Sequence, residues 1–174
     1  MSFKGKSAII CGAGGGTGLN IAIYLLDRQV DVSMVDLKPQ PDSLNERIGR
    51  AQYVQGDVSD DKFAKDVTHQ TVSKFGYLNY LVNATGVLWF GPDKSVVHLD
   101  IDTRDRVMEI TLKSIDLTSR YAIPAIRKSG GGALVHIASI DALRGDEQPQ
   151  DTYGASKAGG IRLDKTLQMQ STKE

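Results

Sequence analysis

The stretch Cys11-Gly12-Ala13-Gly14-Gly15-Gly16-Thr17-Gly18 decides the fold class of this chain. A short apolar run over residues 6–11 precedes the glycines and predicts a buried strand. Apolar residues at helical spacing follow over residues 19–28 and predict a helix. A strand, a glycine turn and a helix in this order predict the first unit of a parallel α/β sheet.

The same alternation of strand and helix continues along the rest of the chain. Further strands are predicted at residues 30–35, 51–55, 77–83 and 133–138, and further helices at 44–48, 60–75, 103–128 and 153–170. Right-handed crossovers between parallel strands give the strand order 3-2-1-4-5. We therefore expect one doubly wound, Rossmann-like α/β domain over residues 1–174, with helices on both faces of the sheet.

Composition excludes several classes of protein. Lysine and arginine total 21, and aspartate and glutamate also total 21, so the formal net charge is zero. Proteins that bind nucleic acids or membrane surfaces need a field of one sign, so this balance argues against such partners. A single cysteine, Cys11, excludes a disulfide framework, and three scattered histidines give no metal-ligand spacing. The sequence has no run typical of a signal peptide or a membrane span, so we expect a cytoplasmic protein without a metal.

The glycine turn is typical of a phosphate-binding loop. Glycine lacks the Cβ that would keep a pyrophosphate away from the backbone, and a helix beginning near Gly16 would direct N–H groups at it. The spacing is G-x-x-x-G-x-G through Gly12, Gly16 and Gly18, and a P-loop ending is missing. The alternative is a flexible loop without a ligand. The remaining residues of the turn that we expect to contact the bound phosphates are Gly14, Gly15 and Thr17.

Asp36 ends the second predicted strand, 18 residues after Gly18. That separation is close to the roughly 20 residues typical of an acid that binds the ribose of a dinucleotide. Its carboxylate would accept hydrogen bonds from both ribose hydroxyls and repel a 2′-phosphate. No arginine or lysine lies in the turn or directly after Asp36. The sequence therefore predicts NAD(H) rather than NADP(H), the alternative being an ordinary acid at a strand end.

Tyr153 and Lys157 are four residues apart at the start of the last predicted helix. This spacing places both side chains on one helical face. A nearby ammonium stabilises a phenolate and lowers a tyrosine pKa from its usual value of about 10, which suits a general acid/base. Ser139 follows the last predicted strand, where open α/β sheets bind ligands, and its hydroxyl could hold a substrate carbonyl oxygen. The alternative is a solvated helix pair.

These motifs together resemble the short-chain dehydrogenase/reductase family, in its Tyr-x-x-x-Lys branch. Asp57-Val58 matches the acid segment that contacts adenine in that family, and Asn83-Ala84-Thr85-Gly86 is a looser form of its Asn-Asn-Ala-Gly segment. The resemblance implies reversible hydride transfer between a nicotinamide and a small-molecule alcohol or carbonyl substrate. It also implies that Tyr153 exchanges the proton, Ser139 orients the substrate oxygen, and Lys157 binds the nicotinamide ribose and tunes Tyr153.

Two departures from the family pattern leave another function open. Thr111 stands where the family has an asparagine that helps hold a water in its proton relay. The chain also stops at Glu174, where family members continue into a further strand and a substrate-covering flap. The alternative is therefore a catalytically impaired dinucleotide-binding module, or a fragment of a longer reductase.

Two further features suggest surfaces for other molecules. Gly159-Gly160 weakens the last helix, which close packing against a partner helix would explain. The resemblance implies such pairing, so we expect a homodimer or homotetramer formed through the last two long helices. Trp89 and Phe90 follow the fourth predicted strand and either line a substrate mouth or pack inside the protein.

Overall fold

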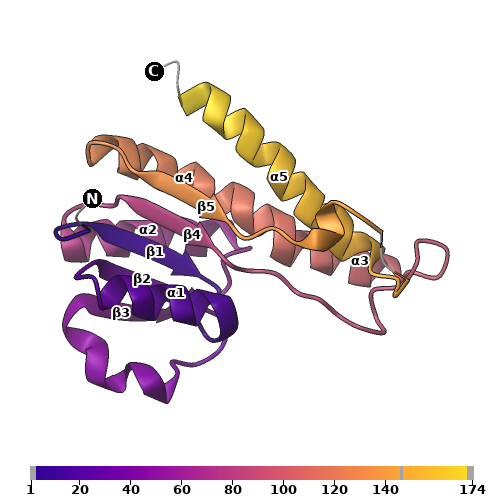
Figure 1. The fold of residues 1–174 in the computed structure, drawn as a ribbon, viewed down its shortest axis with the longest axis horizontal. Coiled ribbons are helices and arrows are strands. Elements are labelled where there is room, and N and C mark those ends of the chain that lie inside the picture. Colours follow the sequence, from indigo (N-terminus) through magenta and orange to yellow (C-terminus); the bar gives the residue numbers. More distant parts are fainter. Residues whose placement is uncertain (1–2, 146, 172–174) are drawn as a thin grey trace. The chain divides into compact units, whose positions relative to one another are not determined.

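The computed structural model describes residues 3–145 and 147–171, and within them the side chains of all residues except 45–48 and 170–171. Its centre is a five-stranded sheet with the order β3-β2-β1-β4-β5 (Figure 1). The strands are β1 (Ser7–Cys11), β2 (Asp31–Asp36), β3 (Ala51–Gln55), β4 (Tyr80–Asn83) and β5 (Ala133–His136). The predicted fold class and strand order are confirmed.

The chain divides into two compact units, which are described separately. The first holds residues 3–85 and 116–135, and the second holds residues 86–115, 136–145 and 147–171. The helices are α1 (Gly16–Leu26), α2 (Asp61–Phe75), α3 (Ile101–Met108), α4 (Ser114–Lys128) and α5 (Asp151–Ser171), with 3₁₀ segments at Asp42–Arg50 and Ile140–Ala142. That residues 1–174 form one domain stays a prediction.

Strand β1 is apolar after Ser7 because both of its faces are buried in the first unit. Ala8 and Ile10 pack on one face with residues of α1, whereas Ile9 and Cys11 pack on the other with residues of α2 and α4. Burial of both faces is typical of a central parallel strand. It explains the apolar run that the sequence shows at this strand. Among the described residues, no helix is both long and apolar enough to cross a lipid bilayer.

Most predicted elements differ from the structure by one or more residues at their ends, and three of them are informative. β4 begins at Tyr80 rather than at residue 77, and just before it the side-chain amide of Asn79 donates a hydrogen bond to the Gly131 carbonyl (3.2 Å). β5 ends at His136 rather than at residue 138, and the next carbonyl, that of Ile137, accepts a side-chain hydrogen bond. The long helix predicted over residues 103–128 is interrupted by a π-helical turn, Glu109–Lys113.

Cys11 should be chemically inert while the protein is folded. Burial, with a smaller effect of the Asp36 carboxylate, raises the pKa of its thiol to about 12. Only the thiolate reacts readily with thiol reagents, so at about pH 8 we expect no reaction with an aromatic disulfide reagent. Unfolding in urea should expose one reactive thiol per chain. Rapid stoichiometric labelling of the folded protein would contradict this assignment.

Candidate active site

The glycine turn brings three pieces of backbone into close contact in the first unit. Gly12 has a φ of +81°, and a Cβ there would lie 2.8 Å from the carbonyl carbon of Ala84. A Cβ on Gly18 would overlap the carbonyl oxygen of Gly12. These two glycines therefore let the turn approach both the end of β4 and the first turn of α1, which no larger residue would permit.

The other side of the turn is open and suits an anion. A Cβ on Gly15 or Gly16 would meet no described atom within 4 Å. Helix α1 begins at Gly16, and no acidic residue lies in its first turn. The first turn of the helix thus carries no carboxylate of its own, and the residues present fit the pyrophosphate of a dinucleotide.

Asp36 supports the same turn from the end of β2. Its carboxylate accepts hydrogen bonds from the backbone N–H groups of Gly14 (2.8 Å) and Lys38 (2.9 Å). Gly14 itself has no room for a side chain, because a Cβ would lie 2.6 Å from Cγ of Asp36. The structure therefore places Asp36 against the glycine turn, and its role toward a ribose stays a prediction.

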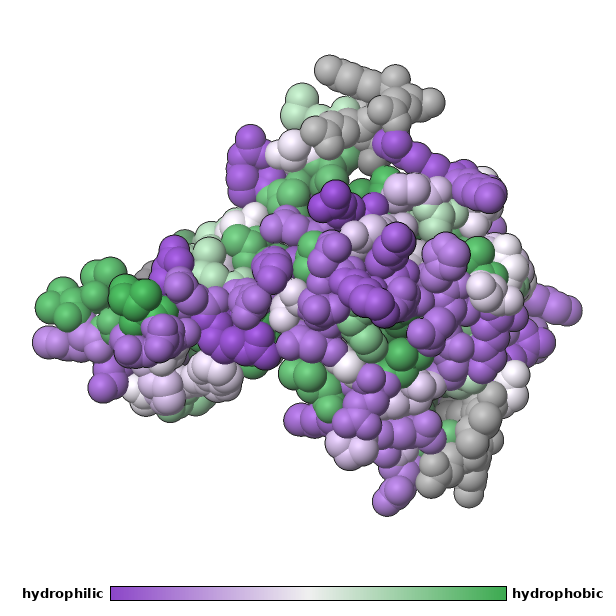
Figure 2. Space-filling view, turned by 180° about the vertical axis from the view of Figure 1, so that it is seen from behind, coloured by the Kyte–Doolittle hydropathy of each residue, from purple (hydrophilic) through white to green (hydrophobic). Residues whose placement is uncertain are grey.

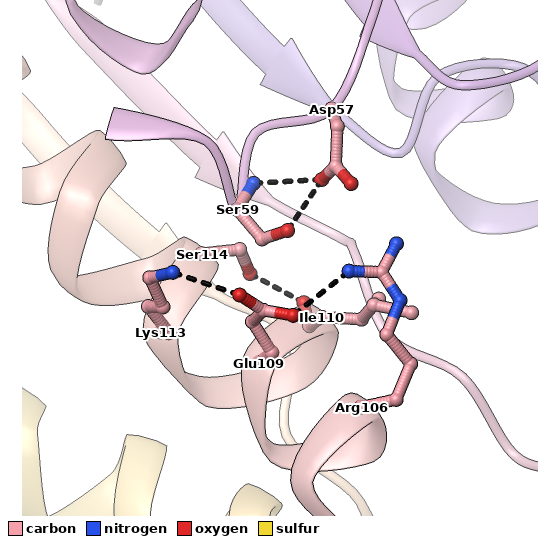
Figure 3. A network of polar contacts seen from close by, with 7 residues as sticks. All are labelled: Asp57, Ser59, Arg106, Glu109, Ile110, Lys113 and Ser114. Carbon is pink, nitrogen blue, oxygen red and sulfur yellow. Dashed lines mark hydrogen bonds and ion pairs between the residues drawn. The ribbon is translucent and has the colours of Figure 1, made fainter. Parts of the chain in front are cut away.

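The remaining cofactor candidates of the first unit lie at the ends of β3 and β4. Asp57 accepts hydrogen bonds from the backbone N–H and the hydroxyl of Ser59 (2.8 and 2.6 Å; Figure 3), and Val58 is buried. Asn83 is also buried; its Oδ1 accepts a hydrogen bond from Thr118 (3.0 Å), whereas its Nδ2 has no partner among the described residues. That amide is a donor that a bound ligand could use.

Tyr153 and Lys157 lie together on the first turns of α5 in the second unit. The Lys157 Nζ is 5.8 Å from the centre of the Tyr153 ring and donates a hydrogen bond to the Ile137 carbonyl (2.8 Å). The Lys157 side chain is buried, and burial lowers the pKa of its ammonium. The predicted juxtaposition on one helical face is confirmed, and the alternative of a solvated pair is wrong for the lysine.

Thr111 and Gly86 border the same lysine. A Cβ on Gly86 would lie 3.0 Å from the Lys157 Nζ and 3.5 Å from the Thr111 Cγ2. Thr111 is fully buried, and its hydroxyl oxygen accepts a hydrogen bond from the backbone N–H of Val87 (3.3 Å). The hydroxyl that replaces the family's asparagine amide is therefore engaged with the segment that follows β4.

The π turn that carries Thr111 is held by polar contacts (Figure 3). The Ser114 hydroxyl donates to the Ile110 carbonyl (2.6 Å). Glu109 accepts hydrogen bonds from Lys113 (2.8 Å) and Arg106 (2.9 Å), and these bonds lower the pKa of its carboxyl. π turns are rare and occur often at functional sites. No periodicity of apolar residues in the sequence predicted this turn.

Ser139 begins the 3₁₀ segment after β5. Its oxygen accepts a hydrogen bond from the Asp141 backbone N–H (3.3 Å), and its hydroxyl donates to the Asp141 carboxylate (3.1 Å). The segment packs on α5, since a Cβ on Gly154 would lie 3.0 Å from the Asp141 carbonyl oxygen. The catalytic candidates Ser139, Tyr153, Lys157 and Thr111 thus all lie in the second unit, and their roles stay predictions.

Comparison with known proteins shows the family. A family model described as short chain dehydrogenase matches residues 6–174. The chain belongs to the short-chain dehydrogenase family. It is 31% identical over 172 residues to an uncharacterized oxidoreductase of Thermotoga maritima, covering 96% of this chain and 66% of that protein.

Two other members of the family are also similar. A cyclohexanol dehydrogenase of an Acinetobacter strain is 31% identical over 173 residues, covering 97% of this chain and 68% of that protein. A crystal structure described as a putative short-chain dehydrogenase/reductase from Burkholderia xenovorans matches with a TM-score of 0.91 and 28% identity, covering 99% of this chain and 68% of that one. The chain thus spans about two thirds of the length of the relatives it matches.

A buried carboxylate that the sequence analysis missed fixes the start of α5. Asp93 is 1% exposed and accepts hydrogen bonds from the backbone N–H groups of Thr152 (3.2 Å) and Tyr153 (2.9 Å). In return, the Asp151 carboxylate accepts a hydrogen bond from the Val96 N–H (2.8 Å). These bonds tie the loop after β4 to the turn that carries Tyr153. No local pattern could reveal a cap about 60 residues away in sequence.

Gly159-Gly160 pack closely against side chains of the same chain. A Cβ on Gly159 would lie 2.9 Å from Leu112 of the π turn, and one on Gly160 would lie 3.3 Å from Ile115. These glycines therefore admit side chains of the same chain, so they give no support for a partner helix. A homodimer or homotetramer stays a prediction, which sedimentation at working concentration tests.

The second unit also has a cavity of about 430 Å³. On α5 its lining residues are Asp151, Gly154, Ala155 and Ala158. At 100° per residue this face is roughly a third of a turn from the face of Tyr153 and Lys157. The cavity therefore does not by itself identify a substrate site.

Trp89 and Phe90 do not pack inside the protein. They are 36% and 63% exposed. Figure 2 shows apolar side chains gathered over the loop before α3, where Val96 and Val97 are also exposed. That Trp89 and Phe90 line a substrate mouth stays a prediction.

Removing the Asp93 cap should destabilise the protein. Asp93→Ala leaves two backbone N–H groups without their partner, and we expect the free energy of unfolding to fall by about 2 kcal/mol. Asp93→Asn keeps one acceptor oxygen and should cost less. As a comparison, Asp100→Ala removes the exposed cap of α3 and should cost about 1 kcal/mol. Urea titration measures all three, and equal losses at Asp93 and Asp100 would contradict a special role for Asp93.

Buried Lys157 should give the folding equilibrium a pH dependence. Its pKa is lowered in the folded chain, so between the lowered value and the ordinary 10.5 the unfolded chain binds more protons. The cost of the buried charge is fully present below this window, and the free energy of unfolding rises as the pH rises through it. We expect Lys157→Met to show a smaller rise than the unaltered chain in urea titrations at increasing pH. Lys165→Met, at an exposed position of the same helix, should keep the full rise.

Proposed function

We propose that this chain is an NAD(H)-dependent oxidoreductase that interconverts an alcohol and a carbonyl compound, with Tyr153 as general acid/base. The observation that carries the proposal is the buried Lys157 ammonium, fixed by the Ile137 carbonyl beside the Tyr153 ring. A lysine is costly to bury, and one held next to a phenol is typical of a site that moves protons.

The cofactor would be held by the first unit. Gly12, Gly16 and Gly18 would shape the pyrophosphate cradle, Asp36 would bind the adenosine ribose, and Asp57 would lie toward adenine. A bound nicotinamide supplies the hydride acceptor or donor. The described residues contain no cluster of His, Cys, Asp or Glu side chains that could hold a metal ion, and the proposal uses none.

The chain's own residues would move the proton and hold the substrate oxygen. In alcohol oxidation the Tyr153 oxygen takes the hydroxyl proton, and in carbonyl reduction it returns that proton. Ser139 would orient the substrate oxygen, and Asp141 holds the Ser139 hydroxyl in the meantime (3.1 Å).

Secondary alcohols are the first substrates to test. One relative of this chain carries the name cyclohexanol dehydrogenase, at 31% identity. A cyclic secondary alcohol would give the reaction class proposed here without requiring a charged binding group. The screen would therefore begin with cyclohexanol and cyclohexanone and extend to linear secondary alcohols.

A catalytically impaired dinucleotide-binding module is the second candidate. It is favoured by Thr111, whose hydroxyl oxygen is engaged by the Val87 N–H at the position of the family's asparagine. Binding of NADH without turnover of any alcohol or ketone in the screen would support this candidate over the first.

Loss of the Tyr153 hydroxyl should separate binding from chemistry. We expect Tyr153→Phe to lower kcat by roughly 10²- to 10⁴-fold, the usual contribution of a general acid/base, with the Kd for NADH unchanged. Tyr121→Phe removes a hydroxyl that bonds Asp61 on the surface and serves as the matched control. NADH fluorescence gives both readouts, and full activity in Tyr153→Phe would rule out the mechanism.

Neutralising Asp36 should weaken the preference for NADH over NADPH. Asp36→Asn keeps one acceptor oxygen but removes the charge that would repel a 2′-phosphate. We expect the ratio of the two Kd values to narrow about tenfold, which corresponds to about 1.4 kcal/mol. Asp66→Asn, on the exposed face of α2, is the control. A wild-type chain that binds NADPH as tightly as NADH would refute the assigned role of Asp36.

A further inference from the structure

The turn that follows β2 is held by the end of β3 in the first unit. Three consecutive backbone carbonyls accept hydrogen bonds of 2.9 Å there, namely those of Asp36, Leu37 and Lys38. The donors are, in the same order, the backbone N–H of Gly56, the side-chain amide of Gln55 and the hydroxyl of Tyr53. Residues 37 and 38 belong to no helix or strand, so these bonds fix a segment that has no regular structure of its own.

One peptide group links Gln55 to the Asp36 carboxylate. The Leu37 carbonyl and the Lys38 N–H belong to the same trans peptide, which is planar, so they point in opposite directions. The carbonyl accepts a hydrogen bond from the Gln55 amide, and the N–H donates one to Oδ1 of Asp36 (2.9 Å). A donor on β3 that fixes this carbonyl therefore also fixes the N–H that holds the carboxylate.

Tyr53 fixes the other side of Lys38. Its hydroxyl donates to the Lys38 carbonyl, while its ring packs against the buried core of the first unit. Burial, with a smaller effect of the Asp36 carboxylate, raises the pKa of this hydroxyl to about 12, so it remains a donor at neutral pH. Pro39 also restricts the residue before it to extended conformations. Lys38 is thus held at both its N–H and its carbonyl.

The Asp36 carboxylate is therefore oriented before any ligand binds. Its Oδ1 accepts a hydrogen bond from the Lys38 N–H, and its Oδ2 accepts one from the Gly14 N–H of the glycine turn. A carboxylate has about four acceptor positions, so two remain for the two hydroxyls of a ribose. Fixing the carboxylate in advance lowers the cost of ordering it when such a ligand binds.

We propose that Gln55 and Tyr53 are positioning residues for the dinucleotide, which strengthen its preference for NADH over NADPH by orienting Asp36. The inference rests on the proposed function, since it concerns the ribose that Asp36 would bind. Neither side chain needs to touch the cofactor. Without the two donors the carboxylate could rotate, so NADH would lose two aligned acceptors and NADPH would meet less repulsion. Both changes bring the two affinities closer together.

Binding of the two dinucleotides tests this assignment. The double variant Tyr53→Phe/Gln55→Met keeps the ring and the length of the side chains but removes both donors. We expect the ratio of the Kd values for NADPH and NADH to narrow about fivefold, less than two full hydrogen bonds would give, because Gln55 is exposed to water. Tyr77→Phe is the matched control and should keep the ratio. It removes a phenol bond of the same length, to Asp31 at the start of β2.

An Asp36→Asn background separates positioning from general destabilisation. There the same two substitutions should change the ratio less than about twofold, because their effect depends on the charge of Asp36. An equal narrowing in both backgrounds, or an unchanged ratio with Asp36 present, would overturn the inference and leave the proposed function intact. A wild-type chain that binds neither dinucleotide would instead refute the proposed function, and this inference with it.

Amide exchange tests the link between Gln55 and Asp36 without any ligand. In the ¹⁵N-labelled full chain, the Lys38 N–H should exchange with water about fivefold faster in Gln55→Met than in the wild type, because the carbonyl of the same peptide loses its donor. The Phe63 N–H, which donates to Oδ1 of Asp60 (2.7 Å), is the internal control. Exchange of the Lys38 N–H at the wild-type rate in this variant would overturn the positioning role of Gln55.

Discussion

The hydrogen bond from Lys157 to the Ile137 carbonyl is the interaction on which the rest of the site depends. It fixes a buried charge, joins α5 to the segment after β5, and leaves the ammonium beside the Tyr153 ring. This carbonyl comes directly after His136, the last residue of β5. Gly86 lies against the same lysine, since a Cβ there would come within 3.0 Å of the Lys157 Nζ.

Two carboxylates perform comparable structural work in the two units. Asp36 receives the backbone N–H of Gly14 in the glycine turn, and Asp93 receives those of Thr152 and Tyr153 at the start of α5. In each case a charged side chain from a distant part of the chain holds the backbone just where a functional helix begins. Charge-assisted bonds of this kind are among the stronger hydrogen bonds available to a protein, so both turns are well fixed before any ligand binds.

The parts of the fold that depend on local pattern could be predicted from the sequence. Strand order followed from alternating strands and helices, and the juxtaposition of Tyr153 with Lys157 followed from helical spacing. The parts that depend on distant contacts could not. Asp93 lies about 60 residues from the turn it caps, and Gly159 packs on Leu112 of its own chain. The His136–Asp164 contact likewise joins a strand to a helix, which residue spacing alone cannot indicate.

The π turn at Glu109–Lys113 sets the phase of the helices that flank it. It accommodates one residue more than an α-helical turn, so the residues after it are displaced by about 100° from the face they would occupy on a regular helix. Within the second unit, Val107 before the turn and Ile115 after it are both buried. A single deletion within the turn would restore regular hydrogen bonding and yet move one of these two side chains toward water. The locally irregular backbone is therefore what keeps both apolar side chains buried at once.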